Sequence, residues 1–139
     1  MWKSLLSTIL VLSFMVGCSG TSSPQAKPQV EELGLEGHDW KLVSFGRTRM
    51  AVPKGAWIAF KEGRYGGNAG CNGMGGEYVK KGNKLLIKPG MSTMMACDDM
   101  RLETKLRQTM DSVTGYRIED NKILLLLNKE TPVLNFMLK

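Results

Sequence analysis

The stretch EYVKKGNKLLIK, residues 77–88, decides the fold class of this chain. Leu85 and Ile87 lie on one face of an extended segment, and Val79 marks a second short run before Lys81-Gly82-Asn83. A short turn that contains glycine and asparagine, placed between two such runs, is typical of a β-hairpin. The stretch therefore predicts two antiparallel strands joined by a tight turn.

Similar short runs recur along the rest of the chain. They comprise Trp40–Leu42, Ile58–Phe60, Ile123–Leu127 and Val133–Leu138, with turn signals at Glu62-Gly63, Glu119–Asn121 and Asn128–Thr131. The run at residues 123–127 is apolar on both faces, so we expect a central or doubly covered strand there. The spacing predicts about eight strands, mostly in an antiparallel meander.

One segment has helical rather than strand periodicity. Its apolar positions are Leu102, Leu106, Met110 and Val113, which share one helical face. Asp98 or Asp99 is expected to cap the start, Gly115 to end the helix, and Glu103 to pair with Arg107 on the outer side. The fold class is therefore α+β and mostly antiparallel β: a small curved sheet or conical open barrel with one packed helix.

The first residues have the composition of an export signal. Lys3 precedes an apolar stretch, Leu5 to Val16, which is too short to span a bilayer. The stretch ends in Met15-Val16-Gly17-Cys18, which resembles the lipobox of bacterial lipoproteins, and a cysteine thiolate is a suitable nucleophile for taking up a lipid. We expect residues 1–17 to be a cleaved signal peptide and Cys18 to be acylated; the alternative is an ordinary signal peptide that contains a cysteine.

Residues 18–32 have little to bury and are expected to form a flexible tether, followed by one domain over residues 33–139. The acylated chain would be held on a membrane by its lipid anchor. Ser19, rather than an aspartate, follows Cys18, and this resembles the pattern of lipoproteins that are forwarded to the outer membrane. The expected location is the cell envelope, on the periplasmic side of the outer membrane.

The net charge of +6 does not by itself indicate a nucleic-acid partner. Lys80 and Lys81 are the only adjacent basic pair, and the remaining basic residues are scattered. We expect a solvated basic surface and no binding of nucleic acid.

Six glycines fall within residues 66–76, with Gly66 and Gly76 included. The segment lacks the Gly-Lys-Ser/Thr ending of a phosphate-binding loop, and Tyr78 occupies the third glycine position of a dinucleotide motif. We expect a glycine-rich bend packed closely around Cys71.

Cys71 and Cys97 remain once Cys18 is lipidated, and an even pair in an exported protein favours a disulfide. The alternatives are two buried free thiols, or a thiol enzyme or redox protein that pairs one cysteine with His38, the only histidine. No Cys-x-x-Cys pair supports redox chemistry, and His38 is expected at the surface.

Met91, Met94, Met95 and Met100 lie beside Cys97 and form a cluster of soft sulfur ligands. Such ligands suit Cu(I). The segment leads into the predicted helix, however, so we expect these methionines to pack in the core. A Cu(I)-binding lipoprotein stays an alternative, and no metal or cofactor is expected.

Two blocks of the sequence resemble the META domain of HslJ-like lipoproteins. The matching residues are Gly70, Cys71, Asn72, Gly76, Tyr78, Met95, Ala96 and Cys97, supported by Thr93 and Glu103. Gly73, Met74 and Asp98 depart from the family pattern. The resemblance implies a conical β-barrel with one helix, structural roles for Cys71 and Cys97, a link to heat and envelope stress, and no established catalytic residue.

These observations favour a non-catalytic, stress-associated envelope lipoprotein that binds a protein or an envelope component.

Overall fold

The predicted hairpin is present in the computed structural model, which describes residues 32–139. Strand β4 (Gly73–Lys81) pairs antiparallel with β5 (Lys84–Ile87), and Val79 lies opposite Leu86. Gly82 in the turn has a φ of +58°, a conformation that glycine adopts without steric cost. The turn residues of the sequence therefore predicted this hairpin correctly.

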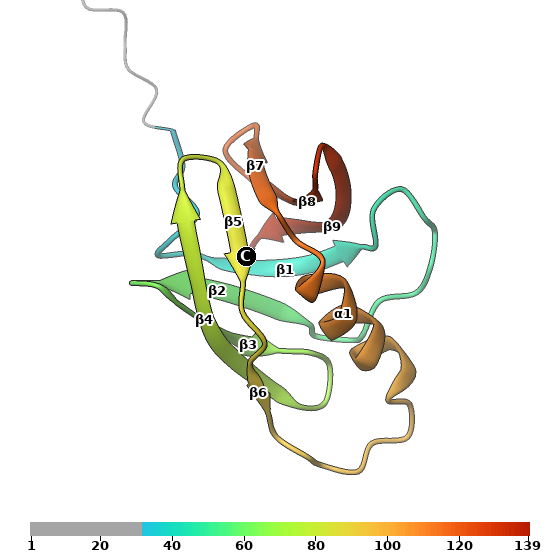
Figure 1. Cartoon of the computed structure of the whole chain (residues 1–139). Helices are drawn as coiled ribbons and strands as arrows, with labels where there is room; N and C mark the ends of the chain where they lie inside the picture. Colours follow the sequence, from blue (N-terminus) through green and yellow to red (C-terminus); the bar gives the residue numbers. More distant parts are fainter. Residues whose placement is uncertain (1–31) are drawn as a thin grey trace, which may run out of the picture. The chain divides into compact units, whose positions relative to one another are not determined.

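Nine strands and one helix make up the described residues (Figure 1). The remaining elements are β1 (Asp39–Ser44), β2 (Trp57–Lys61), β3 (Arg64–Asn68), β6 (Met91–Ser92), α1 (Arg101–Asp111), β7 (Gly115–Glu119), β8 (Ile123–Asn128) and β9 (Thr131–Leu138). The sheet order is β3-β2-β1-β9-β8-β7-β5-β4-β6, and β3 also pairs with β4. This last pairing closes eight of the strands into a ring, which confirms the α+β, mostly antiparallel fold.

The ring is not a regular barrel, because its joints differ in length. Strands β7 and β8 share five registered pairs, Gly115↔Leu127 to Glu119↔Ile123, whereas β5 and β7 share one, Lys84↔Gly115. Two backbone hydrogen bonds support the short joint, from Leu85 N to Thr114 O at 3.2 Å and from Tyr116 N to Asn83 O at 2.9 Å.

The core fills the inside of the ring. Its largest fully buried side chains are Trp40, Phe60 and Phe136. Strand β8 lies between β7 and β9, with four consecutive leucines buried at positions 124–127. The prediction of a central, doubly covered strand is confirmed.

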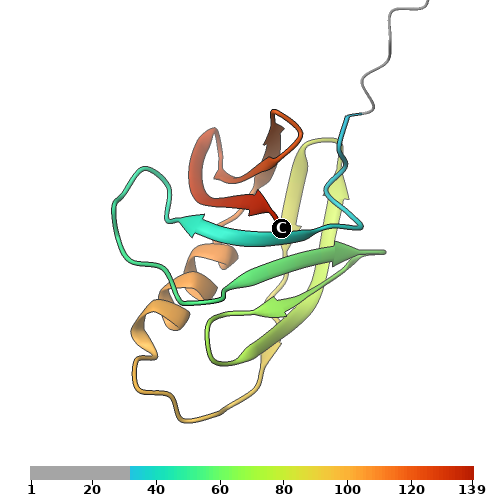
Figure 2. The same ribbon diagram turned by 180° about the vertical axis from the view of Figure 1, so that it is seen from behind.

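Helix α1 covers one end of the ring, beside the loop that follows β6 (Figures 1 and 2). Leu106, Met110 and Val113 are buried as the helical periodicity predicted. The predicted helix ends were less accurate. Gly115 belongs to β7, so the helix ends before it at Asp111.

The predicted N-cap also differs from the structure. Met100 occupies the N-cap position, and its side chain makes no capping hydrogen bond. Asp99 lies one residue earlier. Its Oδ1 accepts a hydrogen bond from the backbone amide of Arg101 at 3.0 Å and another from the Arg101 side-chain Nε at 3.1 Å. The aspartate thus satisfies a free amide of the first turn from outside the helix.

The glycine-rich segment is mostly two paired strands rather than a bend, which corrects the prediction. Gly66 pairs with Gly75 between β3 and β4, and only the loop between these strands turns. At Gly70, in that loop, φ is +128° and an added Cβ would lie 2.7 Å from Cβ of Pro53. This position therefore requires glycine.

Candidate functional site

The two sequence blocks around Cys71 and Cys97 meet at the end of the ring that carries α1. Strand β6 runs along β4, with Met91 opposite Gly75 and Ser92 opposite Met74. This pairing brings the segment after β6 alongside the β3–β4 loop. A disulfide joins Cys71 to Cys97, whose Cα atoms are 6.4 Å apart, within the usual range for a disulfide. The predicted pair is thus bonded in this structure.

Asn72 links the two blocks through hydrogen bonds, and its side chain is fully buried. Its Oδ1 accepts from the Thr93 hydroxyl at 2.9 Å and from the Met95 amide at 2.7 Å. Its Nδ2 donates to the Met95 carbonyl at 3.4 Å, with the sulfurs of Cys97 and Met100 each 3.8 Å away. One amide side chain therefore fixes the segment from residue 93 to residue 100.

Glu103 supports Asn72 from the helix and is also buried, with 3% of its surface exposed. Its Oε2 accepts from the Asn72 amide at 3.1 Å and from the Cys71 amide at 3.4 Å. Its Oε1 has no hydrogen-bond partner among the described residues. We call Asn72, Glu103 and the groups bound to them the polar centre.

The predicted outer pairing of Glu103 with Arg107 was wrong. Glu103 shares the inner helical face with Leu106, Met110 and Val113, at intervals of three, four and three residues. That spacing could have indicated burial. Sequence reasoning missed it because a carboxylate is seldom buried without a partner, and the partners here are backbone amides far away in the sequence.

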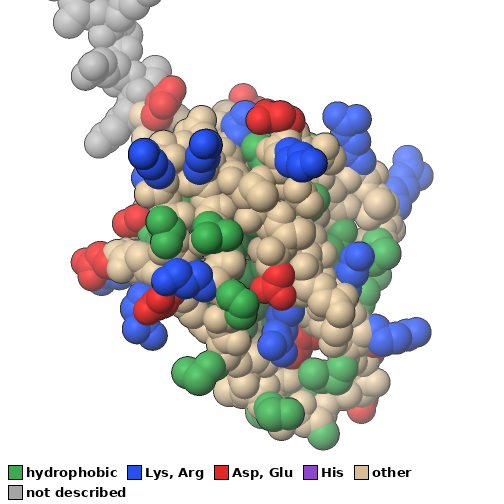
Figure 3. All heavy atoms as spheres, viewed as in Figure 1, with side chains coloured by type: hydrophobic (Ala, Val, Ile, Leu, Met, Phe, Trp, Pro, Cys, Tyr) green, Lys and Arg blue, Asp and Glu red, His purple; other side chains and the backbone are tan. Residues whose placement is uncertain are grey.

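The methionines next to the polar centre are at the surface, which overturns the expectation that they pack in the core. The exposed fractions are 84% for Met91, 96% for Met94, 56% for Met95 and 37% for Met100. Figure 3 shows hydrophobic side chains gathered over β6 and the loop that follows it. The segment crosses the outside of the ring, so these side chains have no core within reach. We call residues 91–100 the methionine segment.

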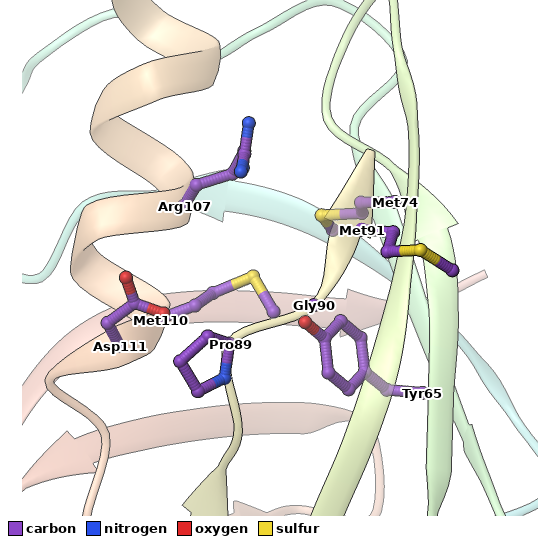
Figure 4. A pocket seen from close by; sticks show the side chains of 8 residues that line it. All are labelled: Tyr65, Met74, Pro89, Gly90, Met91, Arg107, Met110 and Asp111. Carbon is purple, nitrogen blue, oxygen red and sulfur yellow. The ribbon is translucent and has the colours of Figure 1, made fainter. Parts of the chain in front are cut away.

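A small pocket of about 50 Å³ lies between the methionine segment and α1. It is lined by Tyr65, Met74, Pro89, Gly90, Met91, Arg107, Met110 and Asp111. In Figure 4 the side chains of Met74 and Met110 extend toward one another from β4 and α1, with the Tyr65 hydroxyl beside Gly90. The volume is far below the roughly 300–1,000 Å³ of a small-molecule site.

Tyr65 explains two of the glycines around this pocket. An added Cβ would lie 2.8 Å from the Tyr65 ring at Gly76 and 2.3 Å from its hydroxyl at Gly90. Burial raises the pKa of Tyr65, and the nearby carboxylate of Asp111 raises it further. The Tyr65 hydroxyl donates to the Lys88 carbonyl at 3.4 Å, so it serves as a neutral packing group.

Tyr78, the tyrosine of the matching blocks, ties β4 to the segment before β1. Its hydroxyl donates to Oε1 of Glu36 at 2.5 Å, and its ring packs edge-on against Phe60. Burial, followed by the hydrogen bond to Glu36, raises the pKa of Tyr78 to about 12. The same hydrogen bond lowers the pKa of Glu36.

The groups needed for a thiol enzyme are not assembled in the described structure. His38 packs edge-on against Trp40, with ring centroids 5.9 Å apart, and lines a surface hollow with Glu36 and Glu62. Both Cys71 and Cys97 are consumed by the disulfide. Within residues 32–139, no group of three or more His, Cys, Asp or Glu side chains is placed to hold a metal ion.

The predictions for the signal peptide, for Cys18 and for most of the tether lie outside the described residues. Among residues 32–139, no helix combines the length and apolar character needed to cross a membrane.

Comparison with known families decides the relationship of this chain. The family model for the META domain matches residues 33–139, which is most of the sequence. The chain belongs to the META domain family. Within this META domain, the eight motif residues identified from the sequence lie on β4, on the β3–β4 loop and on the methionine segment.

Two solved structures share the fold of this META domain. A protein from Burkholderia xenovorans, solved by NMR, has a TM-score of 0.63 at 21% identity, covering 76% of this chain and 83% of its own. A DUF4847 family protein from Bacteroides vulgatus, solved by crystallography, has a TM-score of 0.57 at 15% identity, covering 74% and 93%. No match was found among curated proteins.

Proposed function

We propose that this META domain chain is an HslJ-like envelope lipoprotein that acts by binding rather than by catalysis. The observation that carries the proposal is the Cys71–Cys97 disulfide. Such a bond is typical of proteins that fold in an oxidising compartment such as the periplasm. While the bond is intact, neither of the two described cysteines is a free thiol nucleophile.

The membrane attachment is argued from the residues before the domain. The sequence Met15-Val16-Gly17-Cys18 ends an apolar stretch that is too short to span a bilayer. Several acyl chains on Cys18 would hold the protein firmly, because each buried CH₂ contributes about 0.8 kcal/mol. Ser19 favours delivery to the outer membrane, with the domain facing the periplasm.

A binding role agrees with the surface of the domain. The pocket beside α1 is small, at about 50 Å³, and its Tyr65 hydroxyl is occupied by the Lys88 carbonyl. The methionine segment, by contrast, presents apolar side chains that the core does not use. Exposed apolar groups gathered in one place are typical of surfaces that contact another molecule.

Labelling with a fatty-acid analogue in intact cells, followed by membrane fractionation, tests the proposed anchor. The wild type should carry label in the outer membrane, and Cys18→Ala should carry none. Ser19→Asp is a matched variant that should keep the label but stay in the inner membrane. Equal labelling of wild type and Cys18→Ala would refute the lipoprotein assignment.

Crosslinking in intact cells before and after a temperature upshift tests the proposed binding role and its link to stress. A specific crosslinked species that becomes more abundant after the upshift would support both. Hydrolytic or redox activity of the purified protein would contradict the non-catalytic assignment, and its loss in Cys71→Ala would assign that activity to the cysteine pair.

A further inference from the structure

The exposed apolar side chains of this domain are unusual because most of them are methionines. Nine large apolar side chains are exposed in the described residues, and six of them are methionines. Four of the six belong to the methionine segment, whereas Met74 and Met110 are buried at 8% and 3% exposure. The segment therefore gathers thioethers in solvent where polar side chains would cost less free energy to expose.

The backbone beneath these side chains is held in place. Met91 pairs with Gly75, the Thr93 amide donates to the Gly73 carbonyl at 3.0 Å, and the Met95 amide donates to Asn72 at 2.7 Å. Met94 lies between two fixed points and is the most exposed of the set. The methionine side chains thus project from β6 and from the anchored loop that follows it, and their flexibility leaves the sulfurs free to move.

Met91, Met94 and Met95 lie within four residue steps of one another along the chain. Four residue steps span at most about 14 Å, and three rotatable bonds per methionine allow each sulfur to swing toward a shared position. Met100 is placed differently, because its sulfur faces the Asn72 amide nitrogen at 3.8 Å.

The surrounding groups favour a soft monovalent cation over other ions. Thioethers are soft ligands that select Cu(I), whereas Mg²⁺, Ca²⁺ and Mn²⁺ prefer oxygen. Asp99 is paired with Arg101 at 3.1 Å, and Asp98 forms no ion pair with any residue of the described domain. Asp98, three residues after Met95, therefore adds a negative charge to the same segment.

We propose that Met91, Met94 and Met95 form a surface site for Cu(I). The sequence favoured core packing over this role because the segment leads into a helix, and the exposure of the side chains removes that reason. The site uses only thioethers, so it leaves the disulfide intact. It does not depend on the lipid anchor or on the proposed binding function.

Anaerobic titration with Cu(I) against a chromophoric Cu(I) chelator tests the site, using the full chain in detergent with its disulfide verified by mass. The test variant is Met91→Leu with Met94→Leu and Met95→Leu, which removes the sulfurs at similar volume. The control is Met50→Leu with Met137→Leu, two methionines that are 47% and 46% exposed elsewhere on the domain. Met1 and Met15 lie in the segment that we expect to be cleaved, and residues 1–17 are identical in all three proteins, so they do not affect the comparison.

The wild type and the control should take up one Cu(I), and the triple variant should bind at least roughly 10–100-fold more weakly, since losing ligands costs more than losing an outer-shell partner. Methyl NMR of the wild type should show Cu(I)-dependent shifts for Met91, Met94 and Met95, and none for Met74. Equal affinity in wild type and triple variant, or shifts spread over all exposed methionines, would overturn the site. A wild type that cannot compete with the chelator would overturn it as well.

Discussion

The polar centre and the methionine segment meet in the same few residues, and their side chains have opposite surroundings. Thr93, Met95 and Cys97 turn hydrogen-bonding groups inward to Asn72. Met91 and Met94 turn long apolar side chains outward into solvent. Here the usual distribution, with apolar groups inside and polar groups outside, is inverted.

The difference teaches where the stability of this end of the molecule lies. Buried polar groups stabilise a fold only when they are paired, and removing one partner leaves the others desolvated. Exposed apolar side chains contribute little, because they touch water in both the folded and the unfolded state. We therefore expect mutations in the polar centre to lower the free energy of unfolding substantially, and mutations of the exposed methionines to change it very little.

Breaking the link between the two regions should have the largest effect. The disulfide joins Cys71, in the loop of the polar centre, to Cys97 in the methionine segment. Losing it should lower the free energy of unfolding by about 2–5 kcal/mol. Cys71→Ala, Cys97→Ala and the double variant should lose similar amounts, because the second substitution breaks no further bond. Urea denaturation with intact-mass analysis measures this.

Additive losses in the double variant would contradict that prediction. They would mean that each cysteine stabilises the fold through its own packing, independently of the bond.

Removing Asn72 compares the two regions directly. Asn72→Ala deletes both hydrogen bonds to Oδ1 and leaves the Met95 amide and the Thr93 hydroxyl without their partner. We expect a loss of about 2–4 kcal/mol, since a buried group left unsatisfied costs about 1–3 kcal/mol. Met94→Ala should change stability by less than about 0.5 kcal/mol, as for other surface substitutions. Thermal or urea denaturation of both variants gives the comparison.

A large loss in Met94→Ala would break the comparison, because it would place Met94 among the residues that hold the fold.

The Tyr78–Glu36 hydrogen bond is an intermediate case between the buried polar centre and the exposed methionines, because Tyr78 is buried and Glu36 is exposed. Tyr78→Phe keeps the ring against Phe60 and should lose about 1 kcal/mol at pH 7. The pKa of Glu36 is lowered in the folded state from its ordinary 4.5, so the stability from this bond is complete above that value and is lost as the pH falls through the lowered pKa. The difference between wild type and variant should therefore shrink toward pH 2.

The alkaline side gives an independent check. The pKa of Tyr78 is raised to about 12 in the fold from an ordinary 10.0. Its contribution to stability is complete below pH 10 and is lost as the pH rises toward 12. A constant difference between wild type and Tyr78→Phe over pH 2 to 12 would contradict both assignments.

Local patterns in the sequence predicted much of the fold. Three of these patterns each span only a few residues: the Gly82-Asn83 turn, the apolar run of β8 and the helical stripe through Leu106. They can be recognised in the sequence without knowing which strands or helices pack beside them. Strand β3 was not predicted, because Gly66 and Gly67 have low strand propensity. Its register is set by β2 and β4 on either side.

The candidate site was less predictable, because its contacts are long-range. Hydrophobicity predicted burial for Met94, but burial depends on which surface the segment crosses. The carboxylate of Glu103 predicted exposure, but amides of a loop more than thirty residues away hold it inside. Both errors concern residues whose surroundings are set by contacts distant in sequence: the pairing of β6 with β4 for Met94, and the β3–β4 loop for Glu103.

The short joint between β5 and β7 gives the closed ring a preferred line of opening. Only Lys84↔Gly115 is in register there, with two supporting backbone hydrogen bonds. Amide hydrogen exchange reports the free energy of such local opening, and the least supported joint opens at the lowest free energy. The amides of Leu85 and Tyr116 are therefore the part of the ring wall where solvent first gains access, while the leucines of β8 exchange only when the whole domain unfolds.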